Sequence, residues 1–378
     1  MKKIKIITTL IGLFLFGAVL IYANTDVPGG YRYLRYSFET ARVLEILEDN
    51  RTINPDFPDT LTGQVLYLVE VATGEHQGYV TTIRTHFFPS FQVDVSEGSR
   101  ISVMLRSMGE GHFDVLLHNQ ERSFVLIGSI VVFFLALGVI GGRRGIMSII
   151  GLVFTLASIL FILIPLLLKG YAPIPVTVLI LAVTATVSLV LLSGWTKKTA
   201  VAMVASMSGV VVAAVLATVV GALANVDGYH LGDTDALIAV GFDTDIQLSG
   251  LFISGALIAS LGAVLDIAMT IASAAEELLA SNKGMTSKQL FAASMNIGRD
   301  AMGTMSNTLI LAFVGSGLSM LVIIYGLGNS FAQVINTDFV AVEIIRSIAG
   351  SLGLVFTVPI ASYVASKVMA GSGKALKK

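Results

Sequence analysis

The sequence contains no cysteine among its 378 residues, and charged residues make up only 13% of it. The missing cysteines exclude disulfide bonds, thiolate metal sites and cysteine nucleophiles. Ordinary soluble domains carry about 25% charged residues, so this chain falls outside that class. Its net charge of −1 gives no excess of positive charge for nucleic acid, and we expect no nucleic-acid partner.

The sequence also lacks the motifs that mark hydrolases, metalloenzymes and nucleotide-binding proteins. No G-x-S-x-G, H-E-x-x-H or Walker loop is present, and these are the patterns that place a nucleophile, a zinc ion or a phosphate. The histidines form no H-x-x-x-H pair and lie at His76, His86, His112, His118 and His230. We therefore expect a protein that is not an enzyme and that uses no metal and no cofactor.

Long apolar runs are abundant, because 54% of the residues are hydrophobic and the mean hydropathy is +0.83. A helix that crosses a membrane needs about 20 mainly apolar residues. Eight segments meet this requirement: about 4–22, 124–141, 146–168, 174–194, 199–223, 248–272, 305–326 and 343–366. The sequence therefore predicts a membrane all-α helical bundle of about eight transmembrane helices, with the lipid bilayer as its first partner.

Lysine and arginine predict which loops face the cytoplasm. They gather in the N-terminal MKKIK, in the loops that hold Arg143, Arg144, Lys197 and Lys198, and in the C-terminal KALKK. We expect a multi-pass protein with both its N- and C-termini in the cytoplasm. A cleaved signal peptide is the alternative interpretation of residues 4–22, and it would leave seven spans.

Residues 24–122 form a polar segment that holds eight arginines, fourteen acidic residues and no lysine. Runs such as QVLYLVEV and RISVMLR are typical of strands, and turn signals such as ATGEHQG separate them. The segment predicts a small β-rich domain outside the membrane, either a sandwich or a barrel of OB-like form. We expect four parts in the chain: an N-terminal membrane anchor at 1–23, this extracytoplasmic domain at 24–122, a multi-helix transmembrane domain at 123–370 and a basic cytoplasmic tail at 371–378.

The sixth apolar segment carries an acid, Asp266, well inside its apolar run. On a helix, Gly255, Gly262, Asp266 and Thr270 share one narrow face of small and polar residues. Small residues let helices approach closely, so we expect Gly255 and Gly262 to pack against a neighbouring helix. An ionised carboxylate inside a membrane costs about 2.5–3.5 kcal/mol unless a partner or a proton neutralises it. Asp266 therefore predicts a proton or ion carrier. The alternatives are a structural hydrogen bond between helices and a residue close enough to the lipid headgroups to be hydrated.

A second polar stripe begins the next span, in the stretch MNIGRDAMGTMSNTLILAFVG. Asp300, Thr304 and Asn307 share a helix face, and Arg299 lies beside them. We expect this stripe to face Asp266, with Arg299 as the counter-charge of that carboxylate. The candidate proton- or ion-coupling residues are Asp266, Arg299, Asp300, Asn307, Thr304 and Thr270, and the candidate helix-packing residues are Gly255, Gly262, Gly298 and Gly303.

Two local signals predict smaller features of the last spans. The start of TSKQLFAAS, at Thr286 and Ser287, is typical of a helix cap and predicts an amphipathic cytoplasmic helix before the seventh span. Glu343 and Arg346 lie three residues apart at the start of the last span, so on a helix their charges are expected to pair.

The two stretches SGALIASLGAVLDIAMTIASAAEEL and SMNIGRDAMGTMSNTLILAFVG resemble the signature region of the YibE/F-like family of bacterial multi-pass membrane proteins. The resemblance covers about 246–325 and implies a location in the bacterial plasma membrane. One helix pair is also similar to part of the resistance-nodulation-division permeases and of SecD/SecF, through Asp266, Glu276, Glu277, Gly298, Arg299, Thr304 and Thr308. That similarity implies a proton relay through Asp266.

Two functions remain open at this stage. The first is a secondary transporter or exporter of an unknown small solute or ion, coupled to protons or ions through Asp266. The alternative is a non-transporting membrane partner or assembly protein, which binds a ligand or a protein through residues 24–122. In that alternative the helices anchor the chain or assemble with a protein partner or with a second copy of the chain as a homo-oligomer.

Overall fold

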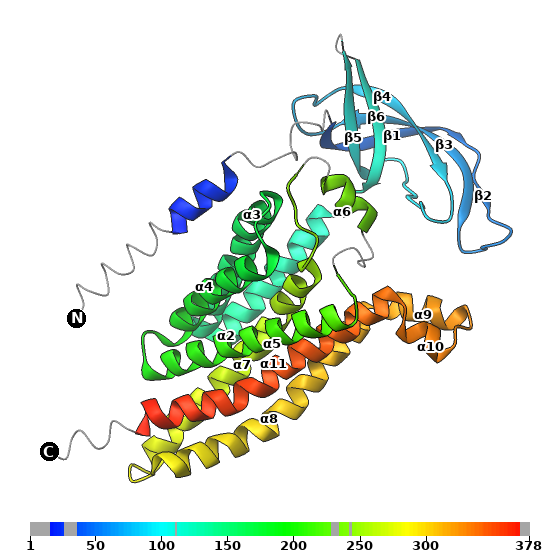
Figure 1. Cartoon of the computed structure of the whole chain (residues 1–378). Helices are drawn as coiled ribbons and strands as arrows, with labels where there is room; N and C mark the ends of the chain where they lie inside the picture. Colours follow the sequence, from blue (N-terminus) through cyan, green and yellow to red (C-terminus); the bar gives the residue numbers. More distant parts are fainter. Residues whose placement is uncertain (1–15, 26–35, 110–111, 228–233, 242–243, 371–378) are drawn as a thin grey trace. The chain divides into compact units, whose positions relative to one another are not determined.

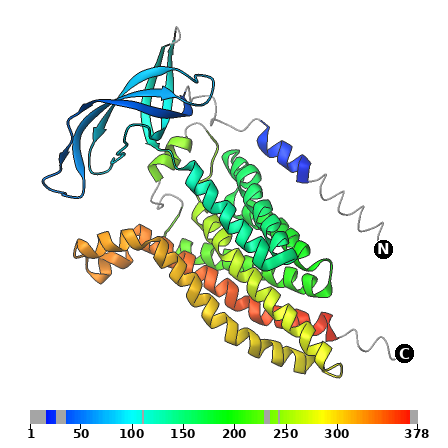
Figure 2. The same cartoon turned by 180° about the vertical axis from the view of Figure 1, so that it is seen from behind.

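A computed structural model of the protein describes residues 16–25, 36–109, 112–227, 234–241 and 244–370 (Figure 1). The chain divides into two compact units, one of Gly30–Ala136 and the other of Met1–Gly29 together with Leu137–Lys378. Strands dominate the first unit and helices dominate the second (Figure 2). We call them the sheet unit and the helical unit.

The described residues of the sheet unit form one antiparallel sheet. Its strands are β1 Tyr36–Asp49, β2 Thr52–Ile53, β3 Leu61–Val71, β4 Val80–Phe87, β5 Arg100–Gly109 and β6 His112–Gln120. The order is β2-β3-β1-β5-β6, and β4 also pairs with β3. Strand β1 is long enough to pair with β5 through its first half and with β3 through its second half. The sheet curls so that β4 and β6 come into contact.

Alternation along the strands creates the core of the sheet unit. Val65, Tyr67 and Val69 of β3 are buried, while the residues between them are partly exposed, because side chains on a strand point to opposite faces in turn. A small ion-pair network joins two loops of the sheet unit: the Arg51 guanidinium contacts Asp49 at the end of β1 and also Asp94. The hydrogen bond from Arg51 lowers the pKa of the Asp49 carboxyl to about 2.

Long apolar helices make up the helical unit and the segment that leads into it. The helices are α2 Ser123–Ser158, the π-helix η1 Ile159–Leu163, α3 Ile164–Leu168, α4 Pro173–Ser193, α5 Lys197–Leu223, α6 Thr234–Gly241, α7 Leu251–Ser281, α8 Ser287–Ser316, α9 Leu318–Gly326, α10 Phe331–Ile335 and α11 Asp338–Val368. Helix α11 contacts α5, α7 and α8, and α4 packs on α5 and α7 (Figure 1).

Small residues set the distances between these helices. A Cβ added to Gly353 of α11 would lie 2.8 Å from the Cβ of Ala213 on α5. On the neighbouring pair, a Cβ added to Gly298 of α8 would lie 2.4 Å from the side chain of Val358 on α11. Close approach of this kind lets dispersion stabilise helices in an apolar environment, where burial alone gives little.

Helix α2 folds back on itself at Gly142, whose backbone lies outside the helical region at φ 54° and ψ −136°. In a straight helix, residues eight apart are about 12 Å apart along the axis. Here a Cβ added to Gly145 would lie only 2.1 Å from the carbonyl oxygen of Leu137. The chain therefore turns sharply between these residues, and Arg143 and Arg144 lie in the turn. We call it the Gly142 turn.

Five helices among the described residues are long and apolar enough to cross a membrane, and the pair α8 and α9 would make a sixth. The continuous helical stretch Ser123–Leu168 counts once in this total, although it contains the Gly142 turn. Most of the predicted span 4–22 lies outside the described residues. The predicted span 305–326 is divided, because α8 ends at Ser316 and α9 leaves it at 62°.

Helix α8 begins earlier than the predicted seventh span. Thr286 caps it, and its hydroxyl accepts a hydrogen bond from the backbone of Gln289 while the Gln289 side chain reaches back. This capping box fixes the start of a single helix of 30 residues. The cap expected at Thr286 or Ser287 is confirmed at Thr286, but no break separates the amphipathic segment from the rest of α8.

Candidate functional site

Asp266 lies on the exposed face of α7. Gly255, Gly262 and Thr270 share this face, while Val264 and Ile267 on the other faces are buried in the bundle. Among the described residues, nothing donates a hydrogen bond to the Asp266 carboxylate and no cation pairs with it. A carboxylate in an apolar helix therefore stands without a counter-charge in direct contact.

A cavity of about 770 Å³ opens beside Asp266. Helices α2, α4, α5 and α7 surround it, together with the turn between α4 and α5. Its lining residues are Arg143, Arg144, Met147, Val190, Leu191, Leu192, Ser193, Gly194, Thr196, Lys198, Asp266, Met269, Ser273 and Glu276. The apolar part comes mainly from α4, and the charged part comes from the Gly142 turn, from the start of α5 and from α7. We call this space the Asp266 cavity.

Local sequence signals place Lys198 at the wall of the cavity. Gly194, at φ +66°, ends α4 in a conformation that favours glycine. Thr196 then caps α5, because its hydroxyl accepts from the backbone N–H of Thr199 at 3.1 Å. Lys198 follows in the first turn and forms an ion pair of 3.2 Å with Glu276 of α7. The start of α5 is thus held against the last third of α7, beyond Asp266.

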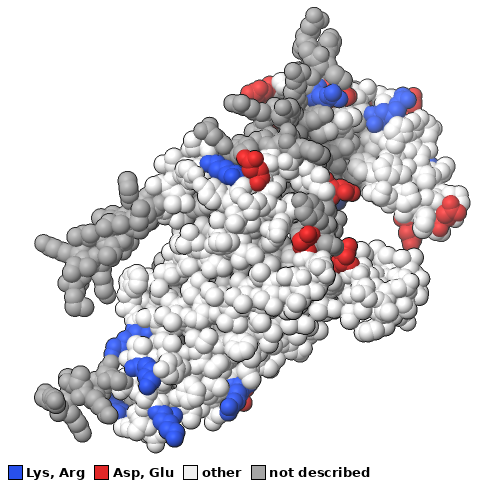
Figure 3. Space-filling view, in the orientation of Figure 1, with Lys and Arg blue, Asp and Glu red and all other residues white. Residues whose placement is uncertain are grey.

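Positive charge collects at this end of the helical unit. Ser287 at the start of α8 donates a hydrogen bond to the carbonyl oxygen of Ser366 near the end of α11, so these helices also meet here. Figure 3 shows lysine and arginine side chains gathered over this end, with an uncharged surface above them. We call it the basic end; its cations include Arg143, Arg144, Lys197, Lys198, Lys288 and Lys367.

The polar stripe of α8 does not reach the Asp266 cavity. Arg299 donates to Asn296 on its own helix at 3.2 Å, and neither Arg299 nor Asp300 lines the cavity. Helix α8 meets α7 through its opposite face, where Gly298 lies against Ile271. The expected pairing of Asp266 with Arg299 is therefore absent from the described residues.

The remaining residues of the α8 stripe do not line the Asp266 cavity either. Thr304 donates to the carbonyl oxygen of Ala301 at 2.9 Å, and Asn307 is exposed. The packing glycines divide into two groups. Gly298 lies in a tight contact, and a Cβ at Gly255 would come within 3.9 Å of Arg346, whereas one at Gly262 or Gly303 would meet open space.

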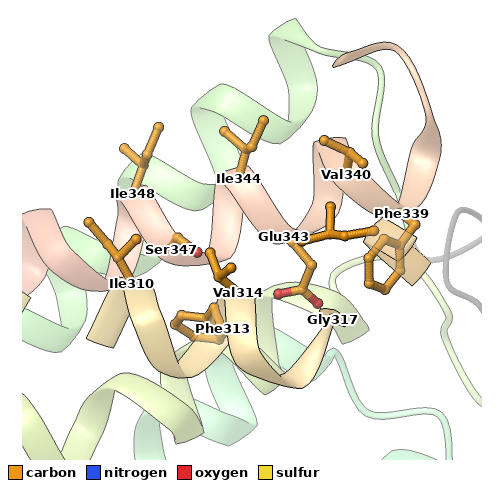
Figure 4. Close-up of a pocket in the computed structure, with 11 residues that line it drawn as sticks. Ile310, Phe313, Val314, Gly317, Phe339, Val340, Glu343, Ile344, Ser347 and Ile348 are labelled. Carbon is orange, nitrogen blue, oxygen red and sulfur yellow. The ribbon is translucent and has the colours of Figure 1, made fainter. Parts of the chain in front are cut away.

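A second acid lies near the other end of the bundle. Glu343 of α11 accepts a hydrogen bond from Arg346 at 2.9 Å, which confirms the pair expected from their spacing. Figure 4 shows the Glu343 carboxylate pointing from α11 toward α8, among apolar side chains. The groove there has a volume of about 270 Å³ and is lined by Ile310, Phe313, Val314, Gly317, Leu321, Phe339, Val340, Glu343, Ile344, Ser347 and Ile348. We call it the Glu343 groove.

Sequence reasoning missed the cations around Asp266. Arg143, Arg144 and Lys198 served only as markers of orientation, although both loops belong to the side where the helix of Asp266 ends. Their position in the order of spans could have identified them. GGRRG, SGWTKK and AAEE follow the second, fourth and sixth predicted spans, and the ends of alternate spans lie on the same side of a membrane. No cluster of three or more metal-ligating side chains occurs among the described residues.

Comparison with known proteins identifies the chain by its helical part. The family model of YibE/F-like proteins matches residues 129–371. No curated protein and no solved structure is detectably similar to the chain. The match covers more than half of the sequence, including α7, α8 and the Asp266 cavity, so this chain belongs to the YibE/F-like family.

Proposed function

We propose that this protein is a secondary transporter or exporter of the membrane, in which Asp266 carries the coupling proton or ion. The observation that carries the proposal is the position of Asp266. Its carboxylate has no partner among the described residues, and it opens into the Asp266 cavity at the basic end. No enzymatic step and no cofactor is part of this function.

The charge of Asp266 needs a neutralising partner. An ionised carboxylate within an apolar helix is costly, and a fixed ion pair or a bound proton can offset that cost. The described residues supply no ion pair to Asp266, because Arg299 does not line the cavity and donates to Asn296 on its own helix. A proton or a small cation is then the neutralising partner, and the cavity supplies its route from one side of the membrane.

The topology that fits this function has eight spans with both termini in the cytoplasm of a bacterial plasma membrane. The Gly142 turn splits α2 into two spans, α8 with α9 counts as one, and the N-terminal segment supplies another. Because the sequence has no cysteine, single-cysteine labelling has no background. With a membrane-impermeant maleimide, Arg144→Cys should react from the cytoplasmic side and Thr244→Cys should react from outside. The reverse pattern would contradict this topology.

Proton-coupled flux is measured in everted membrane vesicles. Respiration acidifies their lumen, acridine orange reports the pH gradient, and small solutes are added one by one. We expect at least one solute to collapse part of the gradient with the wild type. Asp266→Asn removes the titrating group, so the response should fall to the level of vesicles without the protein.

A matched variant separates coupling from general damage. Asp300 is an exposed acid on α8 that does not line the cavity, so Asp300→Asn should keep the wild-type response. Protein abundance is measured in the same vesicles. A wild-type response in Asp266→Asn, or no solute-dependent response in the wild type across the panel, would reject the transport proposal.

The second candidate function rests on the sheet unit. We infer an OB-type barrel from the strand order β4-β3-β1-β5-β6 and from the contact of β4 with β6. A cleft of about 240 Å³ lies along that contact, and Phe88 and Phe91 stack at its edge with ring centroids 5.8 Å apart. This cleft favours a membrane partner protein that binds a ligand outside. In that case Phe88→Ala would abolish ligand binding by the sheet unit, and Asp266→Asn would leave that binding unchanged.

A further inference from the structure

The Asp266 cavity contains two cations that no acid among the described residues neutralises. Arg143 and Arg144 lie side by side in the Gly142 turn and line the cavity. Neither makes an ion pair or a hydrogen bond with another described side chain. The third cation, Lys198, is already paired with Glu276. Two guanidinium groups are therefore available to a ligand.

The start of α5 adds a positive potential on the same wall. Thr196 and Lys198, at its first turn, both line the cavity. A helix of 27 residues carries about half a positive charge at its N-terminus, and that charge attracts anions. The other acid in the lining, Glu276, is engaged by Lys198, and α4 contributes no charged residue.

When Asp266 is protonated, the two arginines without a partner among the described residues give the lining a charge of +2, which favours a dianion over a carboxylate. Arginine recognises phosphate and carboxylate by paired N–H donors, and two neighbouring guanidinium groups match the double charge of a phosphate monoester. The volume of about 770 Å³ exceeds what bare phosphate needs and lies within the range of small-molecule sites, roughly 300–1,000 Å³. The space fits a phosphate group with an organic substituent.

We propose that the Asp266 cavity binds a phosphate-bearing anion, with Arg143 and Arg144 as its ligands. As a substrate class, this assignment rests on the transport function proposed above. The phosphate belongs either to a soluble phosphate ester or to the headgroup of an anionic phospholipid. Asp266 shares the cavity, so its ionised form repels the anion and its protonated form does not. Proton and anion therefore favour each other's binding, which is the coupling that a transporter needs.

The chain carries its own reporter for this site. Its single tryptophan, Trp195, lies between Gly194 and Thr196, which both line the cavity. Tryptophan fluorescence of the purified full-length protein in phosphatidylcholine nanodiscs is titrated with inorganic phosphate and with glycerol 3-phosphate. A parallel series of nanodiscs replaces phosphatidylcholine stepwise by phosphatidylglycerol.

The decisive variant is the double substitution Arg143→Gln with Arg144→Gln. Two charge-assisted contacts are lost, so we expect affinity for the probe to fall at least about tenfold. The matched control, Lys283→Gln with Lys288→Gln, removes the same charge from the α7–α8 connection and from the first turn of α8, both outside the cavity, and should leave affinity unchanged. Asp266→Asn should bind the probe a few-fold more tightly, because the repelling charge is gone.

Each outcome decides one question. A saturable response to the soluble probes, lost in the arginine variant only, assigns a soluble phosphate ester. A response to phosphatidylglycerol alone, with the same loss, assigns a lipid headgroup. No response in either series, or equal responses in both double variants, overturns the proposal. If binding fails while flux still depends on Asp266, only the anion assignment is wrong; if binding holds without any flux, only the transport function is wrong.

Discussion

Two acids in the apolar helices of this protein differ in whether an ion pair neutralises them. Glu343 lies in the Glu343 groove with an arginine on its own helix one turn away, at 2.9 Å. Asp266 lies at the Asp266 cavity and has no direct partner among the described residues, although cations line the same space. A counter-charge one turn away on the same helix holds the Glu343 carboxylate in an ion pair, whereas the cations near Asp266 lie on other helices and form no ion pair with it.

Of the substitutions that test this comparison, removing Arg346 should change stability most. In Arg346→Met, Glu343 stays in the groove without a partner, and an uncompensated charge of this kind should cost about 2–4 kcal/mol of stability. Thermal unfolding in detergent measures the loss. Asp266→Asn, which removes a charge that has no partner among the described residues, should keep the wild-type melting temperature.

A second substitution shows whether that loss comes from the orphaned charge. Adding Glu343→Gln to Arg346→Met removes the orphan and should recover most of the stability. If the double variant is as unstable as Arg346→Met alone, the loss comes from packing of the long Arg346 side chain over Gly255 and not from charge.

Packing along α7 and α11 gives a smaller contrast. The chain leaves no room at Gly353, where a new Cβ would come within 2.8 Å of Ala213 and of the Gly209 carbonyl oxygen. Gly353→Ala should therefore cost about 1–3 kcal/mol of unfolding free energy. Gly262 faces open space beside Asp266, so Gly262→Ala should stabilise the protein by about 0.5–1 kcal/mol, the helix-propensity gain of alanine over glycine. Thermal unfolding compares the two, and a large loss at Gly262 would mean that another helix or a second chain covers this face.

The smallest expected effect concerns a paired acid of the sheet unit. Arg51 lowers the pKa of Asp49 from 3.8 to about 2, so the pair stabilises the sheet unit fully above about pH 4. That contribution is lost as the pH falls from about 4 to about 2. The Asp49 side chain is 40% exposed, so solvent screening limits its worth to about 0.5–1 kcal/mol. Melting curves of wild type and Asp49→Asn should differ at pH 6 and coincide near pH 2.

A resemblance of two stretches predicted the family, and local patterns predicted the apolar helices and the Glu343–Arg346 pair. The helices and the pair depend on local periodicity and on charges one turn apart, which a single helix determines. The neighbours of Asp266 could not be predicted in this way. Helix phase tells which residues share a face with Asp266, but not which of several helices lies opposite that face.

Two further differences have the same origin. The span expected at 305–326 is divided because the chain bends by 62° at Gly317, between α8 and α9. Its first part belongs to a longer helix that begins after the Thr286 cap. Average hydropathy does not register such a bend, since the residues on both sides of it are apolar. Similarly, Arg299 had the right charge to pair with Asp266, but it does not line the Asp266 cavity and donates instead to Asn296 on its own helix.

The most direct test of the central claim is the reaction of the two acids with dicyclohexylcarbodiimide. This apolar reagent modifies protonated carboxyl groups in membranes, and peptide mass spectrometry locates the adducts. We expect the reagent to modify Asp266 and to leave Glu343 unmodified, because Arg346 holds the Glu343 carboxylate in an ion pair. Equal modification of both acids, or an Asp266 that stays unmodified, would contradict the account.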